Sequence, residues 1–598
     1  MQTQKYTVNQ HQISTFLAYV KDGQIAIPEV QRPFVWDSTK VRDLIDSLYK
    51  GYPIGYVITW QNPNVRLKDG NLSAGKKILI DGQQRITALR AALLSEWVVN
   101  KEYDKIKIKI AFNPITESFE VQNPAILKDK TWIPDISEII NNGSLLTTIN
   151  KYLTSNPEQD PAQIENAVNS LINIQYKQLG VIDLSHDLDI ETVTEIFIRI
   201  NSQGVVLSQA DFAMSKIAAN DTYEGHLLRK AIDYFCHLSV APQFFEHVRD
   251  NDKEFAATDY FKKMTWLKDE KDDLFDPSYT DMLRVAFSSE FKRGRMSDLV
   301  SLLSGRNFET REFEESIAAD TYERMKSSVM RFMHEDYFKK FTMIIRSAGF
   351  IEPDMIRSKN ALGFAYILYL KLRQDGVQQA LIEKFVKRWF VYSIITSRYS
   401  GSPESTIDYD IKQIASKGIE DYLTGVEKAD LSEAFWHAGL LQRLDTSVAS
   451  SPLFHVFLAS MVKANDKGFL SKDITVTDLI TFKGDVHHIF PKDYLKKNHL
   501  SRGDYNQISN YVMMQQEINI AIGNKSPDVY FKQIKEQCSG IGRIKYGGIN
   551  SMDELHSNLK THCIPESIFE MNVNHYEEFL TERRKLMADK MKGYYFSL

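Results

Sequence analysis

The pattern of apolar residues changes near residue 220, and this change constrains the fold more than any other feature. Before it, residues 106–112 alternate apolar side chains with lysine or alanine, whereas residues 41–48 carry apolar side chains at helical spacing. From about residue 221 to 400 the pattern is helical almost throughout, and residues 361–372 and 381–395 are expected to be buried helices. We therefore predict an α+β protein that is predominantly helical.

A chain of 598 residues is too long for one hydrophobic core, since single cores stop growing at roughly 250–300 residues. We expect residues 1–220 to mix strands and helices, residues 221–405 to be a helical region, and residues 406–598 to surround a short motif region with helices. The second boundary follows a loop signal at residues 399–403. The last helix, residues 576–592, carries both signs of charge and is expected to be amphipathic and solvated.

Composition excludes several classes of protein. The 73 basic and 78 acidic residues give a net charge of −5, so a nucleic-acid surface must be a local patch. Three widely spaced cysteines, Cys236, Cys538 and Cys563, argue against a disulfide framework and against a cysteine-rich zinc site. No apolar run approaches the roughly 20 residues of a membrane span, and the first residues do not read as a signal peptide. We therefore expect a cytoplasmic protein with no membrane partner.

The strongest chemical signal is the segment 485–491, Asp-Val-His-His-Ile-Phe-Pro. Neighbouring strand residues face opposite sides, so His487 and His488 reach one site only if the strand ends or bulges there, as Pro491 suggests. A neutral imidazole is a base near neutral pH, and a second imidazole with amide or carboxylate oxygens can hold a divalent ion. This favours a metal-dependent phosphodiesterase. A surface loop with satisfied histidines and helix-capping asparagines is an equally open reading.

Local charge agrees with a phosphate-binding surface. Residues 481–550 contain ten basic and six acidic side chains, a local charge of +4 in a chain that is net negative. A phosphate backbone would favour this patch.

A second polar motif lies at residues 81–85, Asp-Gly-Gln-Gln-Arg, where a short β-prone run meets a helix. Gly82 allows close approach of a ligand, the helix N-terminus attracts anions, and Arg85 offers a two-pronged donor for phosphate. Asp81 is suited to orient a metal or a water molecule. No P-loop motif occurs, so a nucleotide site would be of another kind. Taken alone, these residues are more simply a capped helix start.

Two further segments extend the pattern: residues 27–37, IPEVQRPFVWD, and residues 197–204, FIRINSQG. Together with DGQQR and HHIFP, in this order, the chain resembles GmrSD-type restriction endonucleases. The segment 398–402, RYSGS, also recurs in such proteins. The resemblance implies a ParB/sulfiredoxin-like N-terminal domain, a helical middle and a C-terminal ββα-metal (HNH) nuclease domain.

For the C-terminal motif, the resemblance implies a division of roles. His488 takes the position of the general base, and Asn510 takes that of the asparagine that braces the loop and orients the base. His487 stands where relatives often have an acidic residue, which is a departure from the family pattern. The residues so implied in binding a divalent metal such as Mg²⁺ or Mn²⁺ are Asp485, His487 and Asn519. Lys525 is implied in contact with the scissile phosphate.

For the N-terminal motif, the resemblance implies binding and hydrolysis of a nucleoside triphosphate. DGQQR would form the site, Gln31 and Arg32 would flank it, and Asn201 and Asp211 would complete it. The nucleotide-binding residues so implied are Gln31, Arg32, Asp81, Gly82, Gln83, Gln84, Arg85, Asn201 and Asp211.

The resemblance implies a modification-dependent DNA endonuclease of anti-phage defence, with a nucleotide-binding domain that senses the target or gates activity. Its partners would be DNA with modified cytosine or a phosphorothioate backbone, and a nucleoside triphosphate; whether it forms a homo-oligomer is left open. One alternative is a nucleotide-responsive, DNA-binding regulatory protein with an inactive nuclease site, which His487 in place of an acid favours. Another is a nucleotide hydrolase with a structural C-terminal domain.

Overall fold

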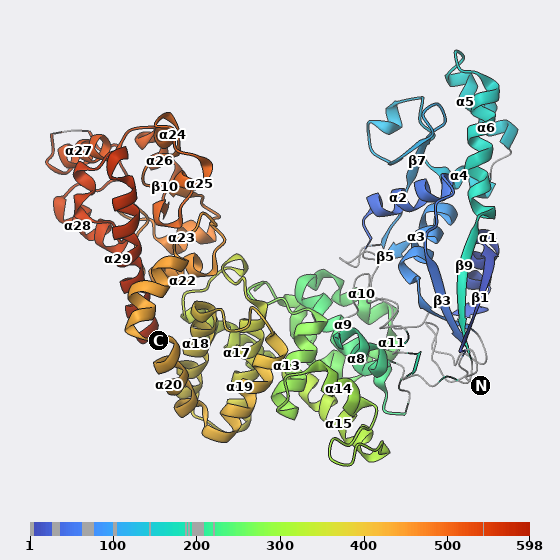
Figure 1. The fold of residues 1–598 in the computed structure, drawn as a ribbon, viewed down its shortest axis with the longest axis horizontal. Helices are drawn as coiled ribbons and strands as arrows, with labels where there is room; N and C mark the ends of the chain where they lie inside the picture. Colours follow the sequence, from blue (N-terminus) through green and yellow to red (C-terminus); the bar gives the residue numbers. More distant parts are fainter. Residues whose placement is uncertain are drawn as a thin grey trace. The chain divides into compact units, whose positions relative to one another are not determined.

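The computed structural model describes residues 5–26, 36–61, 77–99, 105–142, 145–185, 188, 192–193, 196, 209–218, 220, 222–541 and 543–598. The chain divides into two compact units, Met1–Arg229 and Lys230–Leu598. The protein is mainly helical with a small sheet, an α+β fold, as predicted (Figure 1). The division at residue 229 lies close to the predicted one at 220. Residues 221–405 and 406–598 fall almost wholly in the second unit, and the boundary at 405 stays a prediction.

The first unit is built on a five-stranded mixed sheet of order β1-β9-β3-β4-β2. Figure 1 labels three of its strands, β1, β9 and β3. Strands β3 and β9 are parallel, as are β2 and β4, whereas β1 and β4 run antiparallel to their neighbours β9 and β3. The strands are β1 (Tyr6–Gln12), β2 (Ile25–Ala26), β3 (Tyr56–Gln61), β4 (Lys77–Asp81) and β9 (Gln178–Leu184).

Helices cover one face of this sheet. Asp37 caps α2 by accepting a hydrogen bond from the Lys40 amide, and the predicted helical spacing in residues 41–48 becomes its buried face. The apolar side chains of these helices and the sheet form one core. The helices of this core are α1 (Ile13–Lys21), α2 (Ser38–Tyr49), α3 (Gln83–Leu94), α4 (Ile136–Asn142), α5 (Leu145–Ser155) and α6 (Pro161–Ile172); the described residues of α8 (Gln209–Ala218) contribute nothing to it.

The alternating run at residues 106–112 is not one strand, which corrects the prediction. It contributes to β6 (Lys105–Ile106) and, after a break, to β7 (Ile110–Asn113). All four residues of β7 are buried, because β7 packs inside the unit and pairs with β8 (Ser118–Val121). Strand β6 pairs with β5 (Val98–Val99). Alternation of apolar residues was therefore a correct sign of extended chain but not of a single half-buried strand.

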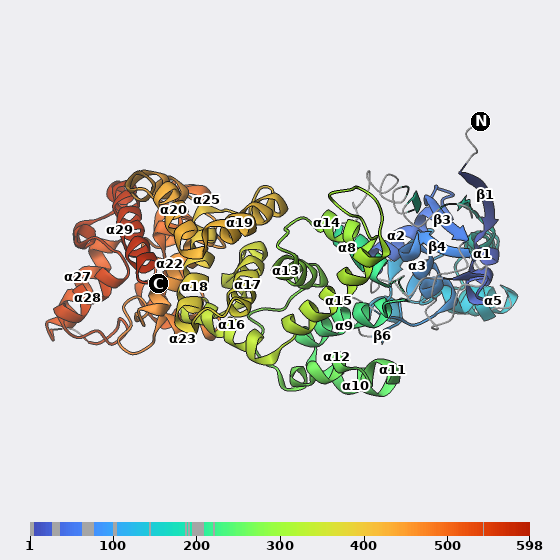
Figure 2. The ribbon, with the colours of Figure 1, turned by 90° about the horizontal axis from the view of Figure 1, so that it is seen from below.

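The second unit is almost entirely helical. Helices α17 and α18 lie side by side in both views and bury most of their residues, which confirms the two predicted buried helices (Figures 1 and 2). Its first helices, beginning with α9 across the division, are α9 (Gly225–Val240), α10 (Phe245–Asn251), α11 (Lys253–Ala256), α12 (Asp259–Lys263), α13 (Tyr279–Phe291), α14 (Met296–Leu303), α15 (Glu315–Phe332), α16 (Glu335–Ser347), α17 (Lys359–Gln374), α18 (Gln379–Thr396), α19 (Pro403–Lys417) and α20 (Ile419–Asp430).

The C-terminal part holds the two-stranded sheet of β10 (Val486–His488) and β11 (Tyr511–Met513). An apolar core that includes Phe490, Val512 and Phe579 surrounds it. Its helices are α21 (Leu440–Arg443), α22 (Pro452–Lys463), α23 (Val476–Thr481), α24 (Lys492–Lys497), α25 (Arg502–Tyr505), α26 (Gln516–Ile522), α27 (Pro527–Cys538), α28 (Met552–Thr561) and α29 (Tyr576–Phe596). No helix in the described ranges is long and apolar enough to span a membrane.

The last helix, α29, corrects the prediction of a solvated helix. Nine of its residues are buried, among them Arg583, whose side chain is fully enclosed. The guanidinium donates hydrogen bonds to three main-chain carbonyls, those of Ser509, Tyr511 and His562, at 2.8–3.3 Å. The charged side chain of Arg583 is therefore buried and not exposed, because carbonyls far away in the sequence accept its hydrogen bonds.

Candidate functional site

The two neighbouring histidines lie at the end of a strand, as Pro491 suggested. In the antiparallel pair β10–β11, His487 faces Val512 and His488 faces Tyr511 in register. The strand ends at His488, and Pro491 becomes the N-cap of α24. After β11 the chain enters α26, so residues 486–522 contain two antiparallel strands followed by a helix.

Asn510 braces the segment that leaves β10. Its side chain is fully buried; Oδ1 accepts a hydrogen bond from the Phe490 amide at 2.8 Å. Its Nδ2 donates to the carbonyls of Phe490 and Tyr505, at 3.1 and 3.2 Å. The backbone continues the link, because the Ile489 amide donates to the Asn510 carbonyl at 2.9 Å. The amide thus fixes the turn beside His488.

The His488 ring is held by a different asparagine. Its Nε2 lies 3.0 Å from Oδ1 of Asn506, and its ring stands edge-on to that of Tyr511, with centroids 5.1 Å apart. Because Oδ1 of an amide only accepts, Nε2 carries the proton and Nδ1 keeps its lone pair. Burial lowers the pKa of His488, and the hydrogen bond that the ring donates to Asn506 partly opposes this. The imidazole is therefore neutral at pH 7 and able to accept a proton.

Asn506 was missed at the sequence level. It lies between α25 and the turn that precedes β11, 18 residues after the histidine that it contacts. The only sequence signal was its place shortly before Asn510, and many loop asparagines occupy such places for reasons of turn geometry.

The residues implied in metal binding lie near the end of β10 and on α26. His487 is half-buried; burial lowers its pKa, and the neighbouring carboxylate of Asp485 opposes this. Asp485 is exposed, and Asn519 is partly exposed on α26. In the described part of the chain, no group of three or more histidine, cysteine, aspartate or glutamate side chains is placed to hold a metal. A metal here would need the Asn519 amide, and its binding stays a prediction.

Lys525 has a structural role that the sequence also allowed. Its Nζ donates to the carbonyls of Ala521 and Ile522, at 2.6 and 3.0 Å, at the end of α26. Such contacts cap the C-terminus of a helix. Burial, with the nearby charge of Lys545, lowers the pKa of the Lys525 ammonium. Contact with DNA stays a prediction for this residue.

The motif at residues 81–85 forms the predicted strand–turn–helix. Strand β4 ends at Asp81, and α3 begins at Gln83. Gly82 has φ of +90°, and a Cβ atom there would lie 2.5 Å from Cγ1 of Val57. Both the backbone conformation and the close approach of β3 therefore require glycine. Since Gly82 offers no side-chain cap, the start of α3 keeps its preference for anions.

The side chains of this motif are engaged within the protein. Arg85 donates to a carboxylate oxygen of Asp81 and to the carbonyl of Ile54, both at 3.0 Å. Gln83 donates to the Leu79 carbonyl at 3.0 Å, and Gln84 is partly exposed. The Arg85 guanidinium thus already has two acceptors within the protein.

Four further residues were implied in nucleotide binding. Gln31, Arg32 and Asn201 lie outside the described residues. Asp211 lies in the first turn of α8, where its side chain is buried and 8% exposed. Their place in a common site stays a prediction.

A polar cluster on the sheet was also missed. Asp183 on β9 accepts hydrogen bonds from Asn9 on β1 at 2.6 Å, Thr59 on β3, and Lys77 on β4 at 2.8 Å. Burial alone would raise the pKa of Asp183, but these donors outweigh it and lower the pKa. Lys77 and Asp81 are at opposite ends of β4, so this cluster is separate from DGQQR. Its members come from four strands, which no local pattern connects.

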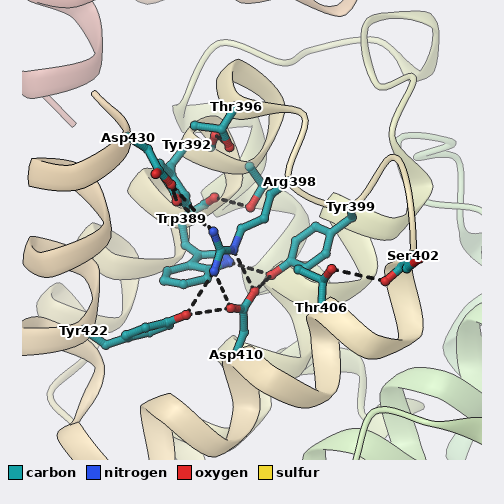
Figure 3. Close-up of polar contacts among 11 residues, drawn as sticks. Trp389, Tyr392, Thr396, Arg398, Tyr399, Ser402, Thr406, Asp410, Tyr422 and Asp430 are labelled. Carbon is teal, nitrogen blue, oxygen red and sulfur yellow. Dashed lines mark hydrogen bonds and ion pairs between the residues drawn. The ribbon is translucent and has the colours of Figure 1, made fainter. Parts of the chain in front are cut away.

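The RYSGS segment forms a buried ion-pair network in the second unit (Figure 3). Nε and Nη2 of Arg398 donate to the two oxygens of Asp410, at 2.8 and 2.5 Å. The hydroxyls of Tyr399 and Tyr422 donate to the same carboxylate, at 2.8 and 2.7 Å. The network ties α18, α19 and α20 together, so this motif is explained by packing.

Residues 13–218 match the family of the GmrSD restriction endonuclease N-terminal domain. The match supports a relationship to the GmrSD restriction endonucleases. The chain is also 21% identical to an uncharacterized protein of Methanocaldococcus jannaschii, over 97% of this chain and 98% of that protein.

The part that matches the GmrSD family runs from α1 to α8 and includes β3, β4 and β9 of the central sheet. It contains DGQQR, the Asp183 cluster except for Asn9, and also Gln31, Arg32, Asn201 and Asp211. The histidine site at β10 lies beyond the matched residues. Its interpretation rests on its own geometry.

Proposed function

We propose that the protein is a modification-dependent DNA endonuclease of anti-phage defence. The observation that carries this proposal is the match of residues 13–218 to the GmrSD restriction endonuclease N-terminal domain. In this proposal the first unit binds and hydrolyses a nucleoside triphosphate and gates cleavage. The C-terminal part cuts DNA with an HNH-type ββα site formed by β10, β11 and α26.

The geometry around His488 supports the cutting centre. Its Nδ1 accepts a proton from a water molecule as the water oxygen bonds to the scissile phosphorus, and the bond from phosphorus to the leaving oxygen then breaks. The Nε2–H group stays hydrogen-bonded to Oδ1 of Asn506. The lowered pKa keeps the imidazole in the neutral form that this step needs. Asn510 holds the turn from which the imidazole projects, so the base is fixed in position.

The donor atoms near β10 fit a divalent ion such as Mg²⁺ or Mn²⁺. His487 contributes a neutral imidazole, and Asp485 and Asn519 contribute carboxylate and amide oxygens. Among the described residues, the Asn519 side chain makes no hydrogen bond that would compete with such a role. When bound, the ion would neutralise charge on the phosphorane and on the leaving oxygen.

In the first unit, the start of α3 supports anion binding. The N–H groups of its first turn and the guanidinium of Arg85 suit phosphate groups of a nucleotide. Phosphate oxygens would take the place of Asp81 or of the Ile54 carbonyl as acceptors for Arg85. Nucleotide binding would therefore loosen the link between β4 and α3, which offers a physical route to gating.

A plasmid-cleavage assay tests the proposal. Substrates are unmodified DNA and DNA with hydroxymethylated or glucosylated cytosine or a phosphorothioate backbone, with Mg²⁺ or Mn²⁺ and with or without nucleoside triphosphates. We expect cutting of one modified substrate, its loss in His488→Ala, and its retention in the control His499→Ala, which changes an exposed histidine. A folded protein that cuts no substrate in this panel would refute the proposal.

A second function is favoured by one observation. Among the described residues, no group of three or more histidine, cysteine, aspartate or glutamate side chains is placed to hold a metal. A DNA-binding regulatory protein with an inactive nuclease site would lack such a group as well. This alternative predicts that DNA binding responds to nucleotide while Mn²⁺ binding is absent in calorimetry. Mn²⁺ binding that is lost in His487→Ala, together with metal-dependent nicking, would exclude it.

A further inference from the structure

Two cations near His488 have no carboxylate partner. Lys492 is the first residue of α24; burial lowers the pKa of His488, and the charge of Lys492 lowers it further. Arg502 is the first residue of α25. Burial raises the pKa of Tyr511, and the charge of Arg502 opposes this. The ring of Tyr511 touches the imidazole of His488. The side chains of Lys492 and Arg502 are exposed, and neither forms an ion pair with any carboxylate of the described chain.

The acidic side chains of α24 and α25 already have partners within these helices or at the N-cap of α25. Asp493 lies 3.9 Å from the ammonium of Lys496. Asp504 accepts a hydrogen bond from the Ser501 amide at 2.8 Å and completes the capping box of α25. The surface beside His488 therefore carries unpaired positive charge, although the whole chain has a net charge of −5.

A buried tyrosine, Tyr505, connects Lys492 and Lys496 of α24 to the histidine. The ammonium groups of Lys492 and Lys496 stand 5.8 and 5.7 Å from the ring centroid of Tyr505. The same ring lies against the imidazole of His488, with centroids 6.4 Å apart. Tyr505 is only 6% exposed and is part of the apolar core, so it is a fixed platform. Cation–π contacts of this kind hold the lysine side chains near the histidine.

We propose that Lys492 and Arg502 bind the backbone phosphates of the DNA strand on either side of the bond attacked at His488. The inference rests on the proposed nuclease function and names the contacts that hold its substrate. A guanidinium grips phosphate with two parallel hydrogen bonds, and an ammonium acts as a point charge. These cations thus take the role that Lys525, occupied at the end of α26, was expected to have.

The test is the salt dependence of DNA binding by the full-length chain, measured by fluorescence anisotropy with a labelled duplex in EDTA. The variants are Lys492→Gln, Arg502→Gln and the double variant. The charge-matched control is Lys497→Gln with Lys428→Gln, both exposed. Lys497 lies about 140° around α24 from Lys492, because residues advance by about 100° along a helix.

We expect each substitution to reduce the slope of log K against log salt by about one unit, and the double variant to reduce it by about two. The control should keep the wild-type slope. A double variant with wild-type affinity and slope, in a chain that still cuts DNA, would overturn this inference alone. A wild-type chain that binds no DNA would contradict the proposed function as well.

Discussion

Replacing Asp410 by asparagine would leave a buried guanidinium facing an amide instead of a carboxylate. In the native protein the Asp410 carboxylate is fully buried and accepts four hydrogen bonds, two from Arg398 and one each from Tyr399 and Tyr422. Burial alone would lower the pKa of Arg398, whereas Asp410 raises it. The Asp410 carboxylate therefore stabilises the buried guanidinium charge of Arg398.

The magnitude follows from the geometry. Removing one partner of a buried ion pair destabilises a protein by roughly 3–5 kcal/mol. Asp430 lies 3.7 Å from Nη1 of Arg398 but is exposed to solvent, so it compensates only in part. We therefore expect a loss of about 3 kcal/mol, near the lower end of that range. The asparagine keeps the shape of the side chain, so cavity formation contributes little.

Hydrogen exchange is the suitable assay, because the unfolding of a two-unit chain of 598 residues is not expected to be two-state. Amides of α18, α19 and α20 should exchange about 100-fold faster in Asp410→Asn, as about 3 kcal/mol implies. The control is Asp421→Asn, an exposed aspartate on α20. Exchange that rises by less than about threefold would refute the reasoning, since the carboxylate would then carry little of the stability.

Three further outcomes are expected. Gly82→Ala should destabilise the first unit more than Gly376→Ala destabilises the second, as measured by hydrogen exchange of the surrounding helices. Both glycines have positive φ, but only at Gly82 would a Cβ atom clash with a neighbour. Burial lowers the pKa of His562 to about 3, so its contribution to the stability of the second unit should be fully present above pH 6.5 and be lost as the pH drops toward 3. In acid denaturation, stability should fall less steeply with pH in His562→Gln than in the wild type, and equal slopes would contradict this. Asn506→Ala should slow cleavage about 10- to 100-fold at saturating DNA with unchanged DNA affinity, because His488 loses its orienting partner; an unchanged rate would exclude that role.

The sequence by itself determined the local geometry of both motifs. Gly82 predicted the turn between β4 and α3, and Pro491 predicted that the strand would end beside the two histidines. The buried helices α17 and α18 were also readable from the sequence. Such features depend on backbone preferences and on the spacing of apolar residues within a few turns, which neighbouring residues set.

The tertiary structure decided which polar groups meet. Asn506 reaches His488 across 18 residues, and Lys77 reaches Asp183 across 106. The most instructive case is Arg583, expected on a solvated helix but buried because carbonyls 21 and 72 residues away accept its hydrogen bonds. Burial of a charged group depends on partners that the folded chain brings near, and their identity is not encoded in the spacing around that group.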